Sequence, residues 1–298
     1  MMGFRTVTLT VAMAIIGLPK SCYQTTKLVQ KTMPPEMYHS TSVEQIEKDT
    51  SARDASIKAL NASVLITASQ GGGTTGKVVT YTSFRGYIFV RKPRDLRVIL
   101  QLPVVGSRAL DMVSDGKTFT LVHATAGHGD AWVMGSNTVT TPSKNGLENL
   151  RPGVFFDSLL VPGVAADEFV SLNESTRIVP LPDKKRVAME EPDYDLTISK
   201  VKSGNVLRTV RVLHISRVNM LPFQQDIYDD KGRVVTSATY EGYKDFNGVK
   251  FPTVITMKRP LEEYALKVEM TKLAINGAFD DDQFELKPPD GAKVQEMK

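Results

Sequence analysis

The sequence is short of the residue types that most enzymes and metalloproteins depend on. Its 298 residues include one cysteine, one tryptophan and four histidines. Because Cys22 is the only cysteine, no disulfide can form within the chain. No Gly-x-Ser-x-Gly segment is present, and no serine has a histidine and a carboxylate arranged around it. These absences argue against an enzyme and against a cofactor.

Metal and phosphate sites are equally poorly supported. His123, His128 and Asp130 lie close in sequence, but their spacing matches no zinc pattern, and a surface hairpin loop explains them better. The acidic run 280–282 lacks the glycine and the terminal glutamate of a calcium loop, which favours a solvated turn. The glycines at 71–73 have no Lys-Ser/Thr and helix after them, so we expect a hairpin there and not a phosphate cradle. We therefore expect no metal.

An excess of charge is missing too. The net charge is only +4, and 23% of the residues are charged against 41% hydrophobic ones. Without Arg5 and Lys20, the two basic residues of positions 1–21, 35 basic residues remain against 33 acidic ones, a net charge of +2. With no basic tract either, nucleic acid is not an expected partner.

Residues 1–21 read as an export signal. The apolar run 7–18 follows Arg5 and is shorter than the roughly 20 residues of a membrane-spanning helix. Cys22 comes directly after it, where a bacterial lipoprotein carries its lipid, although Pro19 and Lys20 depart from the usual signal. A secretory signal followed by an incidental cysteine remains the alternative. Residues 22–42 read as a flexible tether, leaving 43–298 as a single folded domain.

The centre of that domain is predicted at residues 81–122, as four antiparallel strands in a row. Residues 81–90 are aromatic and β-branched, 96–102 alternate between apolar and polar, and 109–113 and 118–122 flank an Asp-Gly turn at 115–116. The first strand has bulky apolar groups on both faces, with Ile88 on one and Tyr87 on the other. A sheet with one face exposed to solvent would not need apolar side chains on both faces. We therefore expect the second face of this sheet to be covered or filled.

The remaining sequence predicts mostly strands. Residues 43–60 read as a helix with Ser42 as N-cap, and residues 154–160 as a short apolar helix. Further strands are expected at 61–69, 132–134, 177–179, 193–202, 206–216, 224–228, 234–243, 251–258 and 266–273. Because strands and helices do not alternate as βαβ units, the sheet should be largely antiparallel.

Several segments resemble one family. Residues 86–97 (GYIFVRKPRDLR) with 113–117 (VSDGK) resemble the bacterial periplasmic lipoprotein carriers and acceptors, the LolA/LolB-like proteins. Residues 221–252 and 276–291 resemble the wider group of outer-membrane lipoprotein-sorting proteins. This resemblance implies an α+β fold, an unclosed antiparallel β-barrel (half-barrel) whose apolar concave face is covered by a few helices and receives acyl chains.

The resemblance also implies functional residues. Arg97 matches the arginine that in the carriers reaches the lid helices and holds them over the cavity. The alternating register puts Ile99 and Gln101 on the same face as Arg97, with Leu96, Val98 and Leu100 on the other side. The residues expected to line a lipid cavity are therefore Arg97, Ile99, Gln101, Tyr87, Phe89 and Met112, with Cys22 as the lipid attachment site.

The function implied is non-enzymatic. We expect a lipoprotein of the bacterial cell envelope, anchored to the outer membrane and facing the periplasm, that binds acyl chains of lipids or lipoproteins. A periplasmic carrier protein is an expected partner. The alternative is a binding module of the same fold, either an envelope stress sensor or a structural partner of another protein.

Overall fold

The computed structural model describes residues 27, 29, 31–125, 129–139, 148, 150–181 and 187–297. The helices in this part are α1 (Val43–Ser56), α2 (Pro152–Leu159) and the 3-10 helix η3 (Asp281–Phe284). The strands are β1 (Lys31–Met33), β2 (Ala59–Gly72), β3 (Lys77–Thr80), β4 (Phe84–Arg91), β5 (Asp95–Gln101), β6 (Arg108–Ser114), β7 (Thr118–Thr125), β8 (Gly129–Ser136), β9 (Phe169–Pro180), β10 (Val187–Ser203), β11 (Val206–Ser216), β12 (Pro222–Tyr228), β13 (Val234–Glu241), β14 (Lys244–Phe246), β15 (Val249–Phe251), β16 (Val254–Arg259), β17 (Tyr264–Ile275) and β18 (Val294–Met297).

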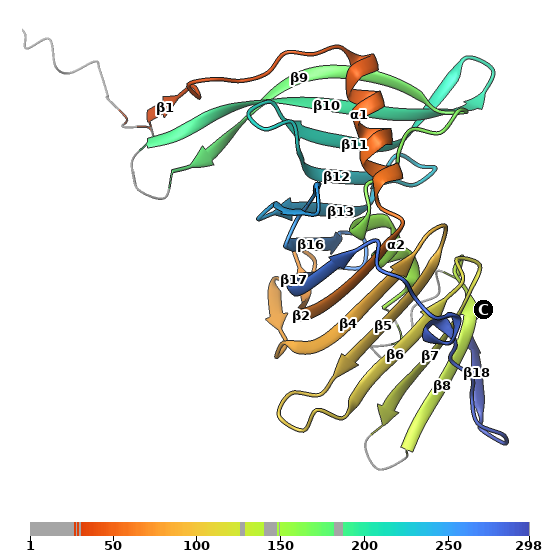
Figure 1. Cartoon of the computed structure of the whole chain (residues 1–298). Helices are drawn as coiled ribbons and strands as arrows, with labels where there is room; N and C mark the ends of the chain where they lie inside the picture. Colours follow the sequence, from red (N-terminus) through yellow and green to blue (C-terminus); the bar gives the residue numbers. More distant parts are fainter. Residues whose placement is uncertain are drawn as a thin grey trace, which may run out of the picture.

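One sheet of 16 strands dominates the described fold, and β14 and β15 form a separate two-stranded antiparallel sheet (Figure 1). Its order is β1-β10-β11-β12-β13-β16-β17-β2-β4-β5-β6-β7-β8-β18, with β9 beside β10 and β3 beside β2. All pairs are antiparallel except β1 with β10 and β18 with β8. The two ends of this order do not pair with each other, so the sheet is unclosed, as the family resemblance implied.

The sheet curls around α2. This helix contacts β13 and β16 and also β6, which is five strand positions beyond β16. In a flat sheet those five steps would span about 24 Å at roughly 4.8 Å each, whereas a helix with its side chains is only about 10 Å wide. Contact with both sides therefore requires a hollow, and α2 occupies it.

The four central strands follow the predicted pattern. β4, β5, β6 and β7 are consecutive neighbours, and the turn between β6 and β7 has Gly116 at φ +85°. The Asp115 carboxylate accepts hydrogen bonds from the backbone N–H groups of Lys117 and Thr118, at 2.8 and 2.7 Å, which closes this turn. Gly86 allows β4 and β5 to approach closely, because a Cβ atom there would lie 2.1 Å from the Ile99 carbonyl oxygen.

Helix α1 begins where the sequence placed it. Ser42 Oγ accepts a hydrogen bond from the Gln45 backbone N–H at 3.3 Å, which caps the first turn. The helix ends at Ser56, four residues before the predicted end, because Ala59 already belongs to β2. Ile46 is its buried anchor on the sheet.

The segment before α1 is partly attached to the sheet. β1 pairs with β10, and the Arg217 side chain donates to the His39 carbonyl at 2.9 Å and to Ser40 Oγ at 2.8 Å. The predicted signal peptide and Cys22 lie outside the described residues. No helix in the described ranges is long and apolar enough to cross a membrane.

Candidate functional site: the inner face and its plug helix

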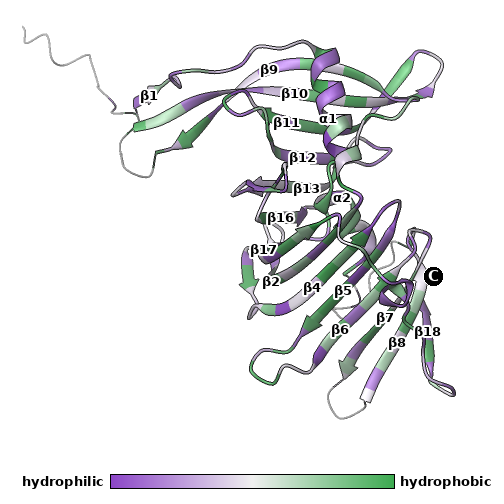
Figure 2. Ribbon diagram, viewed as in Figure 1, coloured by the Kyte–Doolittle hydropathy of each residue, from purple (hydrophilic) through white to green (hydrophobic). Residues whose placement is uncertain are grey.

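The inner face is defined here as the side of the sheet that α1 and α2 contact. Residues that pair across neighbouring antiparallel strands point to the same side, so this face can be followed through the register. It runs from Leu196 in β10 to Val133 in β8 and is almost continuously apolar. Its members include Leu213, Ala238, Met257, Leu266, Ile66, Ile88, Val98, Met112 and Leu121. Figure 2 shows hydrophobic and hydrophilic positions alternating along the strands.

Helix α2, the plug helix, covers the centre of this face. Its sequence PGVFFDSL starts with proline at the first helical position, where no backbone donor is lost. Val154, Phe155 and Leu159 are buried and belong to the same core cluster as the sheet residues. Burying three such side chains contributes roughly 5–9 kcal/mol at about 1.5–3 kcal/mol each.

Two sheet side chains hold the backbone around α2. Gln225 Nε2 donates to the Asp157 carbonyl at 2.7 Å. Arg211, which is buried in β11, donates to the carbonyls of Pro162 and Gly163, both at 2.6 Å. A guanidinium is suited to this because it offers several donors in a fixed plane, and the carbonyls after a helix have no partner within it. Arg211 and Gln225 therefore do here what the resemblance assigned to Arg97.

Polar atoms beneath the plug helix are not all satisfied. In the described part of the chain, the buried atoms Ser158 Oγ, Gln225 Oε1 and Tyr240 OH have no hydrogen-bond partner. Each unsatisfied buried group costs about 1–3 kcal/mol, roughly 3–9 kcal/mol for the three. This cost offsets part of the gain from the three apolar side chains of α2, so the plug helix is held less firmly than its apolar contacts alone would hold it.

Burial also affects the carboxyl group of α2. It raises the pKa of Asp157 to about 6, against the opposing influence of Arg259 and Arg94. The docked helix thus favours the protonated form of this side chain.

The space left beside the plug helix is small. A pocket between α1, the end of α2 and β12–β16 has a cavity volume of about 20 Å³, which is room for about one water molecule. Sites that enclose a small-molecule ligand typically measure about 300–1,000 Å³. In this described part of the inner face, an acyl chain therefore finds room when α2 moves away.

The predicted lining residues are divided between the two faces. Met112 lies on the inner face and shares the core with α2. The alternation along β5 is confirmed, but the face assignment is reversed, since Leu96, Val98 and Leu100 point to the plug helix. The residues that point to the outer face, the side opposite the plug, are Tyr87, Phe89, Arg97, Ile99 and Gln101. Sequence periodicity separates two faces but does not say which one a distant helix will cover.

The outer face is covered by a segment near the carboxyl end of the sequence. Residues 276–293, here called the strap, run from β17 across β4 and β5 to β18 (Figure 1). Phe279 contacts Phe89 edge-on with ring centroids 5.9 Å apart. Arg91 pairs with Asp281 at 2.6 Å. The apolar groups expected on both faces of β4 are thus explained by a plug on one side and a strap on the other.

Arg97 belongs to this outer contact. Its guanidinium forms two hydrogen bonds with the buried Asp111 carboxylate, at 3.0 and 2.9 Å, and donates to the Gln283 carbonyl of η3 at 2.9 Å. This helix carbonyl lies on the strap and not on α1 or α2, so the predicted role of Arg97 in holding a lid over a lipid cavity stays a prediction. A role of these outer residues in lipid binding stays a prediction.

The residues considered as metal ligands do not form a common site in the described structure. His123 is buried and its Nε2 lies 2.9 Å from a carboxylate oxygen of Glu148, while Asp130 pairs with Arg108 at the surface. His128 lies outside the described residues. Within the described ranges no group of three histidine, cysteine or acidic residues is placed to hold a metal ion.

Arg211 and Gln225 are the site residues that sequence reasoning missed. The sequence did indicate that Arg211 faces inward. It alternates with the same period as Leu213 and Ile215 in β11, which are both buried. An arginine in that phase needs partners, and here they are the carbonyls of Pro162 and Gly163 and the Glu168 carboxylate, which lies 3.5 Å away.

Comparison with known proteins gives similar folds at low identity. No family model matches the sequence, and no curated protein matches it. A DUF1329-family protein from Desulfovibrio piger is similar over 81% of this chain and 95% of that chain, with 15% identity and a TM-score of 0.49. A LolA-superfamily protein from Nitrosomonas europaea is similar over 83% and 99%, with 13% identity and a TM-score of 0.49.

A third similar structure comes from Vibrio parahaemolyticus and is described as an outer-membrane lipoprotein-sorting protein domain. It covers 80% of this chain and 94% of that chain, with 12% identity and a TM-score of 0.44. All three likenesses fall below a TM-score of 0.5.

Proposed function

We propose that this protein is a non-enzymatic lipoprotein of the bacterial cell envelope that binds acyl chains of lipids or lipoproteins on its inner face, in lipoprotein sorting or lipid transfer to the outer membrane. The observation that carries the proposal is the plug helix. Among the described residues, an apolar helix fills a hollow of an almost continuously apolar sheet face, and buried polar atoms around it have no partners.

Displacement of α2 by an acyl chain is energetically reasonable. Each methylene removed from water contributes about 0.8 kcal/mol, so a sixteen-carbon chain gains on the order of 12 kcal/mol of burial. The undocked helix would expose its three buried side chains, at a cost of roughly 5–9 kcal/mol, and would release the unsatisfied Ser158 hydroxyl to water. The exchange therefore favours the chain by several kcal/mol.

Weakening the plug helix tests this directly. Phe155→Ala removes the largest buried side chain of α2 and should raise the affinity for an environment-sensitive apolar dye, and for competing long-chain acyl groups, by about tenfold or more. The reason is that a ligand binds only the undocked state, and each 1.4 kcal/mol lost from docking raises that population tenfold. Dye titration of the chain after signal removal measures it.

The control is Ile46→Ala, which opens a buried position under α1 in the other core cluster. It should lower stability without raising dye affinity. Mass spectrometry of lipids that co-purify with the protein provides a second measurement. A folded Phe155→Ala variant with unchanged dye affinity, and no co-purified lipid, would count against the proposal.

The second candidate is a protein-binding module of the same fold, such as a stress sensor. Strand β9 supports it, because in the described part of the chain this 12-residue strand pairs only with β10 and leaves its other edge open. Open edges accept an added strand from a partner. Absence of lipid together with insensitivity to Phe155→Ala favours this candidate.

A further inference from the structure

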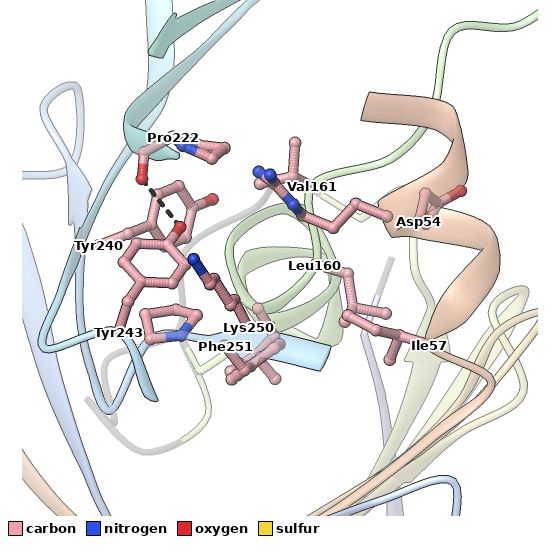
Figure 3. Close-up of a pocket in the computed structure, with 12 residues that line it drawn as sticks. Asp54, Ile57, Leu160, Val161, Pro222, Tyr240, Tyr243, Lys250 and Phe251 are labelled. Atoms are coloured by element: carbon pink, nitrogen blue, oxygen red, sulfur yellow. Dashed lines mark hydrogen bonds between the residues drawn. The ribbon is translucent and has the colours of Figure 1, made fainter. Parts of the chain in front are cut away.

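The small pocket beside the plug helix is lined by both apolar and cationic side chains. It lies where the ends of α1 and α2 meet β12–β16 (Figure 3). Most of the lining is apolar, and Leu159, Leu160 and Val161 at the end of α2 form one wall. Two cationic side chains, Arg53 and Lys250, line it as well. The pocket is therefore continuous with the hollow proposed to take an acyl chain.

Neither cation forms an ion pair within the described part of the chain, and the Asp49 carboxylate acts on Arg53 only from a longer distance. No carboxylate of the described residues lies within ion-pair distance of Arg53 or Lys250, and Asp54, the one acid in the lining, pairs with Lys92. Arg53 is only partly exposed, and among the described residues its side chain makes a single hydrogen bond, to the Met220 carbonyl at 3.2 Å. A guanidinium has five N–H donors, so most of its donor capacity is unused. A partly buried positive charge of this kind favours an anionic partner.

Tyr240 adds an independent observation. Its side chain is 4% exposed, its hydroxyl has no hydrogen-bond partner among the described residues, and the hydroxyl points into the pocket (Figure 3). Burial raises the pKa of Tyr240 above its ordinary range, so the hydroxyl remains a donor. The neighbouring Tyr243, in contrast, donates its hydroxyl to the Pro222 carbonyl at 2.8 Å. Of the two tyrosines, only Tyr240 has a donor left for a ligand.

We propose that this pocket binds the anionic head group of an amphiphile, a carboxylate or phosphate attached to an acyl chain. Arg53 and Lys250 supply positive charge, Tyr240 supplies a hydrogen bond, and the chain lies along the inner face that α2 vacates. Because the end of α2 is a wall of the pocket, movement of the plug helix enlarges the head-group site and the chain site together. This inference rests on the proposed function and names its ligand class.

The test compares ligands that share a chain or a head group. Binding of hexadecyl phosphate, palmitate, 1-hexadecanol and inorganic phosphate is measured by dye displacement and calorimetry on the full chain after signal removal. Arg53→Gln should weaken hexadecyl phosphate and palmitate by about 10- to 100-fold, the size expected for a lost charge-assisted hydrogen bond, and hexadecanol by less than twofold. Arg53→Lys should retain most of the affinity.

Tyr240→Phe separates the head-group role from a structural one. It should weaken the two anionic amphiphiles severalfold while raising the melting temperature of the ligand-free protein, because it removes an unsatisfied buried hydroxyl. Lys244→Gln, an exposed lysine in the same β14–β15 hairpin as Lys250 but outside the pocket, is the matched control and should change neither quantity.

Three outcomes would overturn the inference. If Arg53→Gln weakens hexadecanol and the anionic ligands equally, or weakens none, the pocket does not read the head group. If inorganic phosphate alone binds as tightly as hexadecyl phosphate, the site takes a free anion and not an amphiphile. If hexadecanol and the anionic amphiphiles all fail to bind, the proposed acyl-binding function fails, and this inference fails with it.

Discussion

At the scale of single residues, two arginines show how position on the sheet decides what a guanidinium does. Arg211 points inward and holds the carbonyls that follow the plug helix. Arg97 points outward, forms a two-bond ion pair with Asp111 and holds the strap through Gln283. Both guanidinium groups are partly or fully buried and bind oxygen atoms. The residue type alone does not indicate on which face of the sheet an arginine will lie.

The Arg97–Asp111 pair gives a prediction about stability. Arg97→Leu leaves the Asp111 carboxylate, which is 7% exposed, without its ion-pair partner. Removing one partner of a buried pair typically costs about 3–5 kcal/mol, and some solvent reaches Arg97, so we expect a loss of roughly 2–3 kcal/mol in the free energy of unfolding. Denaturant titration measures it.

Arg94→Leu is the control for this prediction, since Arg94 is exposed and no ion pair of it occurs among the described residues. It should change stability by less than about 0.5 kcal/mol. The double variant Arg97→Leu/Asp111→Leu should recover most of the loss by removing the stranded charge. Equal behaviour of Arg97→Leu and Arg94→Leu would contradict the structural role of Arg97.

At the scale of elements, the plug helix and the strap cover opposite faces with different chemistry. The strap is attached by the Arg91–Asp281 ion pair and by edge-on aromatic contacts, and it continues into β18, which pairs with β8. The plug helix is attached by three apolar side chains and by carbonyl contacts from the sheet, with unsatisfied polar atoms beneath it. The plug is therefore the element suited to exchange with a ligand.

The docking of α2 should depend on pH through Asp157. Its folded-state pKa is raised to about 6, so the folded protein retains a proton that the unfolded chain has already lost between about pH 4 and 6. The stabilisation is complete below about pH 4 and is lost as the pH rises through 6. The loss is on the order of 1–2 kcal/mol, taking 1.4 kcal/mol per pKa unit and discounting for solvent that reaches the side chain.

Stability and dye affinity measured between pH 4.5 and 7.5 test this dependence. Dye affinity should rise with pH in the unaltered protein, and Asp157→Asn should flatten the profile. Burial also raises the pKa of Asp193, in β10, to about 6. Asp193→Asn is therefore the control: it should alter the pH profile of stability but not that of dye affinity. If Asp193→Asn, and not Asp157→Asn, flattened the pH profile of dye affinity, the titrating group would lie away from the plug helix.

At the scale of the whole molecule, one unclosed sheet provides both the hollow and an open edge. The segment that leads into it from Cys22 is attached to the sheet by β1 and by residues 39–40. If Cys22 is acylated, as the sequence predicts, this attachment sets how far the domain stands from the membrane surface.

Cys22→Ser tests the anchor. We expect the unaltered protein to partition into detergent and to incorporate palmitate, because durable anchoring requires two or more acyl chains. The substitution should abolish the label and release the protein from the membrane fraction, whereas Ser21→Ala should retain both properties. Membrane association that survives Cys22→Ser would exclude Cys22 as the anchor.

The sequence alone determined the elements whose signals are local. The N-cap at Ser42, the Asp-Gly turn at 115–116, the alternation of β5 and the order of β4 to β7 depend on contacts between residues close in the chain, and all are confirmed. The presence of a cover on the second face of β4 was also predictable, because its side chains are apolar in both phases of the alternation.

Only the tertiary structure decided which cover lies on which face. A period of two marks two faces but is symmetrical between them, so the inward direction at Val98 and the outward direction at Arg97 were assigned the wrong way round. The strap reaches Arg97 from residue 283, and β17 brings Ile275 beside Leu60. Contacts over such separations depend on the curl of the whole sheet, and no local pattern of residues specifies them.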